Sequence, residues 1–106
     1  MRILHVTTFQ SWESAKQSGL YSADALESSG FIHACLPEQL SGVLRQWFAN
    51  QQDLLILEIE TDLLEPRLVM ENLEGSQEEF PHIYGPLNLN AVLNCRRLTL
   101  EDLEAK

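Results

Sequence analysis

The sequence predicts a single α+β domain, in which a mixed or mostly antiparallel sheet of about five strands carries two to three packed helices. One observation predicts this class, and a second predicts the single domain. Stretches with a period of two and stretches with a period of 3.6 follow one another irregularly, without the strict alternation of a doubly wound sheet. The 106 residues contain no linker, internal repeat or low-complexity tract, so we expect one domain over residues 1–106.

The N-terminal residues predict a strand followed by a short helix. Residues 3–7 alternate between two faces, which places His5 in the middle of a strand. Thr8 can cap a helix over residues 9–18, and Gly19 supplies its stop. The first helix is therefore expected to leave directly from the first strand.

A second short helix and a second strand follow. Residues 22–30 are typical of a capped helix that ends at a glycine, and residues 31–35 alternate as a strand with His33 at its centre. Pro37 suits the first turn of the next helix. The apolar positions of that helix follow helical spacing: Leu40, Val43, Leu44, Trp47 and Phe48. We interpret this wide stripe as core.

The second half of the chain predicts three further strands. Residues 53–60 alternate as a half-buried strand whose acidic face should meet water. Residues 67–71 form a shorter strand that ends at Glu71, and residues 91–98 form the last one. A capped terminal turn begins the C-terminal tail, residues 99–106.

One segment between these strands packs two prolines, a glycine, a histidine and a tyrosine into eight positions: Phe80-Pro81-His82-Ile83-Tyr84-Gly85-Pro86-Leu87. Proline fixes φ and glycine permits unusual backbone angles, so the segment has few available shapes. An imidazole and a phenol on such a rigid loop lose little entropy when they bind a ligand, which predicts a functional loop. The alternative interpretation is that Ile83 and Tyr84 fill the core and that the prolines shape a connection between strands.

Composition and charge exclude several classes of partner. Hydrophobic residues make up 44% and charged residues 22%, as in ordinary soluble domains, and no apolar run is long enough to cross a bilayer. The N-terminus enters a strand pattern without a signal-peptide core, so we expect a cytoplasmic protein with no membrane partner. The net charge of −9 repels polyphosphate and argues against nucleic acid as a partner. Without an export signal, Cys35 and Cys95 are expected to be free buried thiols.

The candidate chemical groups are spread along the chain. They are three histidines, two tyrosines and a carboxylate: His5, His33, His82, Tyr21, Tyr84 and Glu71. They converge on one cleft if the first, second and fourth strands are neighbours. The alternative is structural: the two strand histidines bond to backbone, Tyr21 anchors a loop through its hydroxyl, and Glu71 is solvated.

Two other kinds of chemistry remain open. Three histidines and a carboxylate could complete a zinc or iron site, but no metal-binding spacing supports it, so no metal ligand is assigned. Cys35 is interpreted as a small buried hydrophobic residue, with a nucleophilic role two residues after His33 as the alternative.

Several motifs together resemble a known family. They are Gly19-Leu20-Tyr21, Ala25-Leu26-Glu27-Ser28-Ser29-Gly30-Phe31-Ile32-His33, Gln39, Glu71 and the segment 80–87. Over about residues 2–98 the chain resembles the domain of unknown function 952 (DUF952) family, which is grouped with ADP-ribosyltransferase-like proteins. The resemblance implies a bent, split sheet with a site in the cleft between its halves.

The resemblance also implies roles for individual residues. It implies that His5 orients a ribose, that Glu71 stabilises an oxocarbenium ion, and that Tyr21 or Tyr84 stacks on nicotinamide. His33 and His82 would position a phosphate or an acceptor. The expected catalytic residues are therefore His5, Glu71 and His33, and the expected ligand-binding residues are Tyr21, His82, Tyr84 and Gly85.

The expected function is that of a small ADP-ribosyltransferase-like protein that binds NAD or a related ribosyl nucleotide and transfers or hydrolyses ADP-ribose. NAD would be a substrate and not a resident cofactor, and the expected partner is a small nucleotide-like ligand. Two alternatives stay open. The first is a non-catalytic small-ligand binding module, and the second is a histidine-based, metal-dependent hydrolase.

Overall fold

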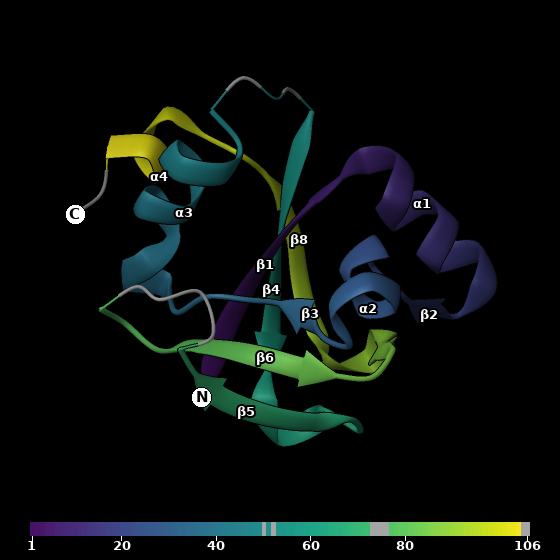
Figure 1. Ribbon diagram of the computed structural model, residues 1–106. Helices are drawn as coiled ribbons and strands as arrows, with labels where there is room; N and C mark the ends of the chain where they lie inside the picture. The colour runs from purple at the N-terminus through teal and green to yellow at the C-terminus, as the bar shows by residue number, and fades with distance from the viewer. Residues whose placement is uncertain (50, 52, 73–76, 105–106) are drawn as a thin grey trace.

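Antiparallel strands form three sheets in the computed structural model, which describes residues 1–49, 51, 53–72 and 77–104 (Figure 1). The strands are β1 (Arg2–Thr8), β2 (Leu20–Tyr21), β3 (Ile32–His33), β4 (Leu54–Glu60), β5 (Arg67–Glu71), β6 (Phe80–Tyr84), β7 (Leu87–Asn88) and β8 (Val92–Arg97). The helices are α1 (Phe9–Ser18), α2 (Asp24–Ser29), α3 (Leu40–Trp47) and α4 (Leu100–Glu104). This confirms the α+β class. None of the described helices has the length and apolar character needed to cross a membrane.

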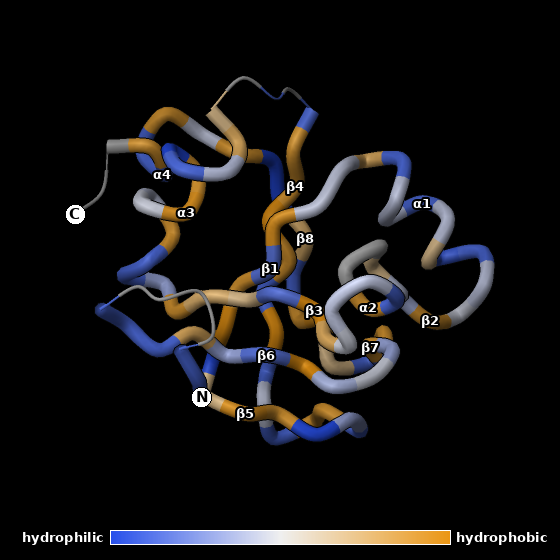
Figure 2. Tube along the Cα trace, in the orientation of Figure 1, coloured by the Kyte–Doolittle hydropathy of each residue, from blue (hydrophilic) through white to orange (hydrophobic). Residues whose placement is uncertain are grey.

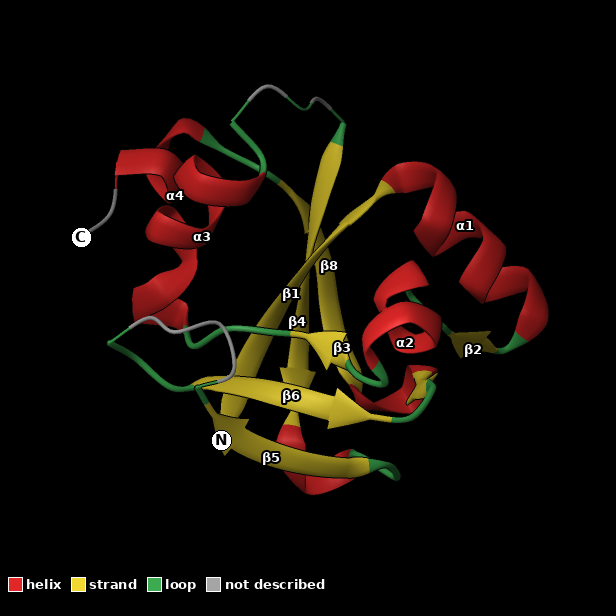
Figure 3. Cartoon of the chain, viewed as in Figure 1, coloured by secondary structure: helices red, strands yellow, loops and turns green. Residues whose placement is uncertain are grey.

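The sheets are arranged as two three-stranded layers and one short pair. Their orders are β1-β4-β8, β3-β6-β5 and β2-β7, and all their pairings are antiparallel. Figure 3 shows α3 and α4 on one side of the β1-β4-β8 sheet and α1 and α2 on the other. An isolated bridge joins Leu4 of β1 to Cys35, just after β3, so the two larger sheets meet there.

Local signals explain the helix ends. The Thr8 hydroxyl accepts a hydrogen bond from the Ser11 backbone N–H at 3.1 Å, which caps α1 as predicted. Gly19 and Gly30 end α1 and α2 in the left-handed region, with φ of 91° and 87°. Each signal lies within a few residues of the helix end that it determines.

The β1-β4-β8 sheet is covered on both faces, which corrects one prediction. Figure 2 shows hydrophobic residues continuing along β4, and Ile56 and Leu57, which point to opposite faces, are both fully buried. We predicted a water-facing side for residues 53–60, but Leu40 and Leu44 of α3 pack over that side. The helix was predicted correctly, whereas its packing position could not be read from the strand.

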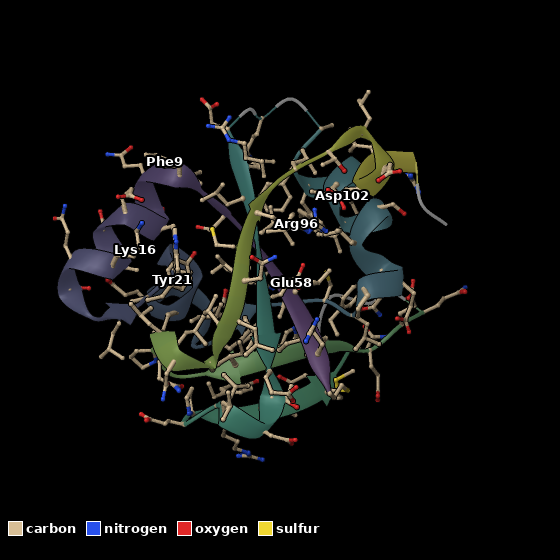
Figure 4. All side chains as sticks on the ribbon, turned by 180° about the vertical axis from the view of Figure 1, so that it is seen from behind. Phe9, Lys16, Tyr21, Glu58, Arg96 and Asp102 are labelled. Carbon is tan, nitrogen blue, oxygen red and sulfur yellow. The ribbon has the colours of Figure 1, made fainter. Side chains whose placement is uncertain are left out.

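Arg96 connects the C-terminal helix to the sheet. Figure 4 shows its side chain between Glu58 and Asp102. Its Nε donates to Glu58 at 3.2 Å, and its two terminal nitrogens donate to the two Asp102 oxygens at 2.8 and 2.9 Å. Asp102 also accepts the Thr99 backbone N–H at 2.8 Å. These bonds lower the pKa of Asp102, with Arg96 the largest cause, and they fix α4 against β8.

The segment 80–87 is mainly a strand and not the rigid loop that we predicted. β6 is the central strand of its sheet, because it pairs with both β3 and β5. The Pro81 carbonyl accepts the Ala34 N–H at 3.1 Å, but Pro81 has no N–H to donate in return, and the paired residues of β3 end at His33. Ile83 is fully buried, as the alternative interpretation expected, whereas Tyr84 is 38% exposed.

Gly85 permits a close approach at the end of β6. A Cβ placed there would lie 2.9 Å from Cβ of Pro66, and the φ of Gly85 is +157°. We expect Gly85→Ala to lower the free energy of unfolding by about 2 kcal/mol through overpacking, measured by urea denaturation. Gly42→Ala, in α3 with no atom within 4 Å of the added Cβ, is the matched control and should be neutral or stabilising. Equal stability of the two variants would contradict the steric argument.

Candidate functional site

A cavity of about 430 Å³ lies along the free edge of β1, a volume typical of sites for small ligands. The polar side chains in its wall include four predicted site residues and one threonine: His5, Tyr21, His33, His82 and Thr7. Its apolar wall includes three residues at α3 and its end, and one from β6: Val43, Trp47, Phe48 and Phe80. The three histidines, which are 28 and 49 positions apart in sequence, therefore meet at one cavity.

His5 belongs to a buried hydrogen-bond network. Its Nδ1 lies 2.5 Å from the His33 carbonyl oxygen, and its Nε2 lies 2.8 Å from the Tyr21 hydroxyl. The Tyr21 hydroxyl is also 2.8 Å from the Thr7 hydroxyl. A carbonyl can only accept, so Nδ1 carries the proton, and Nε2 of the neutral ring accepts from Tyr21. Thr7 can then donate to Tyr21 in turn.

Burial keeps His5 neutral. Desolvation lowers its pKa to about 4, against the opposing hydrogen bond to His33, because a buried imidazolium has lost its hydration. Both ring nitrogens are engaged within the protein, and the residue is 7% exposed. His5 thus matches the structural alternative of an interior histidine bonded to backbone, while its ribose-orienting role stays a prediction.

His82 belongs to a second network, on the β3-β6-β5 sheet. Its Nδ1 lies 2.9 Å from Glu71 Oε1, and the Tyr84 hydroxyl donates a very short hydrogen bond to the same oxygen. The hydrogen bonds from Tyr84 and then from His82 lower the pKa of Glu71, while the bond to Glu71 raises the pKa of Tyr84. Glu71 is therefore an ionised acceptor that holds the Nδ1–H of His82.

The other ring nitrogen of His82 has no partner among the described residues. Nε2 is fully buried, and the His82 side chain is 0% exposed. His82 is also one of the residues that line the cavity, while its Nδ1 is held by Glu71 on β5. Buried polar atoms without partners are rare and call for an explanation such as a ligand or a catalytic role.

Aromatic rings hold His82 in place from two sides. Phe31 stacks on it with a centroid separation of 4.0 Å and an interplanar angle of 22°. His33, which pairs directly with His82 across β3 and β6, packs edge-on at 5.5 Å. The ring of His33 is itself exposed, so it forms the part of this cluster that faces solvent. The His82 ring therefore has little freedom to turn away from Glu71.

The apolar stripe of α3 divides between core and cavity, which corrects our interpretation of it as core alone. Leu40 and Leu44 are buried in the packing against the sheet. Trp47 is 59% exposed, and it lines the cavity with Val43 and Phe48. A two-turn helix does not need five apolar residues for a single interface. The extra apolar residues were the signal in the sequence that part of the stripe faces something other than the core.

The backbone of β1 also contributes polar groups to the site. Leu4 exchanges two hydrogen bonds of 2.8 Å with Cys35, so the N–H and C=O of Leu4 point away from β4. Strand alternation directs the N–H and C=O of Val6 to the same edge, where the cavity lies and where no described strand continues the pairing. The cavity therefore contains an adjacent backbone donor and acceptor.

Cys35 lies in the cavity wall as an inert thiol. Both cysteines are free, as predicted, and Cys35 is 2% exposed while Cys95 is half-buried. Desolvation raises the pKa of Cys35 to about 12, so its reactive thiolate form is suppressed. The geometry favours the interpretation of Cys35 as a small buried hydrophobic residue over a nucleophile.

The remaining predicted residues lie outside the cavity wall. Glu71 contacts His82 from behind, and Tyr84 contacts Glu71. Gly85 packs against Pro66 at the end of β6. Within the described residues, no group of three histidine, cysteine or acidic side chains has the geometry to hold a metal ion. Both His5 nitrogens are already bonded within the protein, so His5 offers no free nitrogen to a metal ion in this arrangement.

Comparison with known proteins places the chain in a family. The model of DUF952, described as a protein of unknown function, matches residues 6–95. The crystal structure of protein CC0527 from Caulobacter crescentus is 30% identical, with a TM-score of 0.84 over 94% of this chain and 88% of that chain. The solution structure of CC0527 is also 30% identical, with a TM-score of 0.80 over 93% and 85%. No curated protein matches. The chain therefore belongs to the DUF952 family.

Proposed function

We propose that the cavity binds the nicotinamide-ribose end of NAD or of a related ribosyl nucleotide, and that the protein transfers or hydrolyses ADP-ribose there. The observation that carries this proposal is the buried, unpartnered Nε2 of His82 beside an aromatic-walled cavity. The Nδ1–H tautomer makes this nitrogen an acceptor, so the ligand should supply a hydrogen-bond donor, such as a hydroxyl group.

The free edge of β1 supports a ligand that carries a carboxamide. A primary amide offers one acceptor and two donors in a fixed plane, which complements the N–H and C=O of Val6. A carboxylate in the same place would put its negative charge against the Val6 carbonyl. The edge therefore favours nicotinamide over nicotinic acid.

The apolar wall and the charge of the cavity support a flat cationic ring. Trp47, Phe48 and Phe80 can contact the faces or edges of such a ring, and a cation is attracted to an aromatic face. Lysine and arginine are absent from the described residues of the wall, and the chain carries a net charge of −9. The pyrophosphate of NAD would therefore lie outside the cavity, in solvent.

Titration of isotope-labelled protein tests this proposal. We expect nicotinamide mononucleotide and NAD to shift the Val6 amide and the His82 ring signals together, with saturation. The nicotinic acid analogue of the mononucleotide should bind at least about tenfold more weakly, because the carboxylate leaves the Val6 carbonyl unpaired. Equal affinity of the two mononucleotides would contradict carboxamide recognition.

Trp47→Ala tests the aromatic wall in the same titration. Loss of one stacking surface should weaken the binding of the mononucleotide by about tenfold. Phe9→Ala is the matched control, because Phe9 is 54% exposed and lies outside the cavity wall. An unchanged affinity in Trp47→Ala would place the ring elsewhere, and an equal loss in both variants would indicate non-specific binding.

A non-catalytic binding module is the second candidate. It is favoured by the position of Glu71, because the carboxylate expected to stabilise an oxocarbenium ion does not line the cavity. A saturating titration with no nicotinamide release on prolonged incubation would select this second function. Release of nicotinamide at a rate that depends on His82 would select the first.

A further inference from the structure

We infer that His82 is the base that takes the proton of the acceptor hydroxyl, from water or an alcohol, during ribosyl transfer, and that Glu71 is its positioning residue. This inference rests on the proposed function, and it names the acceptor class for the same cavity. It also gives Glu71 a role that differs from direct contact with the ribose.

The contacts of His82 resemble those of a base oriented by a carboxylate. Glu71 accepts the Nδ1–H at 2.9 Å, which leaves an unshared lone pair on Nε2 of a residue that lines the cavity. The His82 side chain is 0% exposed, so a proton gained at Nε2 creates a buried imidazolium whose nearest counter-charge is Glu71. The Tyr84 hydroxyl fixes the orientation of Glu71 and is itself at the surface.

The charged and titratable neighbours of this pair are few. Glu71 faces His82 from β5, His33 faces it edge-on from β3, and Tyr84 faces Glu71 from β6. Arg67 lies opposite Tyr84 and acts on Glu71 through its charge. Among these groups only Glu71 contacts a ring nitrogen of His82 in the described structure, so it is the group that orients the ring.

The step is balanced without an oxidant or a reductant. The acceptor oxygen forms a bond to C1′ of the ribose, and the bond from C1′ to the nicotinamide nitrogen breaks. Nicotinamide leaves as a neutral molecule with that electron pair. The acceptor proton moves to Nε2 of His82, whose positive charge Glu71 compensates, and it passes to water when the products leave.

Kinetics of nicotinamide release from NAD test the assignment in three variants. His82→Gln should lower kcat by about 100-fold or more, as removal of a general base does. Glu71→Gln should lower kcat by about 10- to 100-fold, and Tyr84→Phe should lower it by about 3-fold. In both variants the affinity for the mononucleotide should stay within about twofold of wild type. Glu101→Gln, an exposed carboxylate in α4, is the matched control and should keep the wild-type rate.

The pH profile separates positioning from a merely structural role. Glu71→Gln replaces the anion beside Nδ1 of His82 by a neutral amide, so the shape of the pH profile of kcat should change in this variant. A variant damaged only in its folding would lose amplitude at every pH without a change in the shape of the profile.

A tautomer measurement reports on the pair without any activity. The ¹⁵N shifts of the wild-type His82 ring should show a protonated Nδ1 and an unprotonated Nε2, and Glu71→Ala should reverse or mix this assignment. A wild-type ring with its proton on Nε2 overturns the inference, whatever the activity.

Three outcomes of the kinetic and binding measurements remain, and each decides between the proposals. Turnover that survives in both His82→Gln and Glu71→Gln overturns the inference and leaves the proposed function intact. Wild-type protein that binds the mononucleotide without releasing nicotinamide overturns the base role and selects the binding module. Absence of any binding refutes the proposed function itself, together with the inference that depends on it.

Discussion

Trp12→Ala is expected to lower the free energy of unfolding by about 3–5 kcal/mol, the usual cost of truncating a buried tryptophan. Trp12 is 9% exposed on α1, and it packs in the core with Tyr21 at a ring separation of 6.5 Å. The loss combines the transfer of the indole to water with the cavity that it leaves. Because small domains have total stabilities of about 5–15 kcal/mol, the variant should be close to unfolding.

Trp47→Ala is the matched comparison, because the chain has only these two tryptophans. Trp47 is 59% exposed, and its removal should change the free energy of unfolding by less than about 1 kcal/mol. Urea denaturation followed by circular dichroism measures both variants without relying on either indole. Similar losses in the two would show that Trp47 belongs to the core, and its assignment to the ligand wall would then be withdrawn.

The stability of the protein is expected to fall by about 3 kcal/mol between pH 6.5 and pH 4 through His5 alone. The pKa of His5 is about 4 in the folded state, against 6.5 for an ordinary histidine, because of desolvation. The unfolded state therefore binds the proton first as the pH falls. Stability is complete above pH 6.5, decreases through this window and levels off for this group below about pH 4.

His5→Gln isolates this contribution, because glutamine does not titrate. The difference in unfolding free energy between wild type and variant should shrink by about 3 kcal/mol from pH 7 to pH 4. The carboxylates with lowered pKa, such as Asp102, affect both proteins equally and cancel in the difference. A constant difference across the range would show that His5 is not buried in its neutral form.

Much of the local architecture could be predicted from the sequence. The cap at Thr8, the stops at Gly19 and Gly30, and the alternation of residues 3–7 all describe interactions within one or two turns or within one strand. Such interactions depend on residues that are close in sequence, so the pattern carries the information. The irregular order of strand and helix patterns predicted the α+β class, which the antiparallel sheets confirm. The family resemblance added the expectation of a bent, split sheet, and the family itself is confirmed by the match over residues 6–95.

The segment 80–87 shows why some local predictions were wrong. Its prolines and glycine indicated a loop, but Pro81 occupies a strand in which its missing N–H interrupts pairing with β3 alone. Gly85 is required where the chain passes Pro66, about twenty residues earlier in sequence. The same residues therefore suit a loop as well as a strand followed by a turn. Contacts with residues that are distant in sequence decide between these two structures.

The sequence by itself determined the residue types of the site, namely three histidines, two tyrosines and a carboxylate, and the local elements that hold them. Only the tertiary structure decided that His82 faces the cavity with Glu71 behind it, and that Trp47 lines the cavity as well. The physical reason is that a strand pattern specifies which residues share a face, whereas partner strands and covering helices are chosen by long-range packing. The contact of β1 with Cys35, which leaves the edge at Val6 open, is one of these long-range contacts.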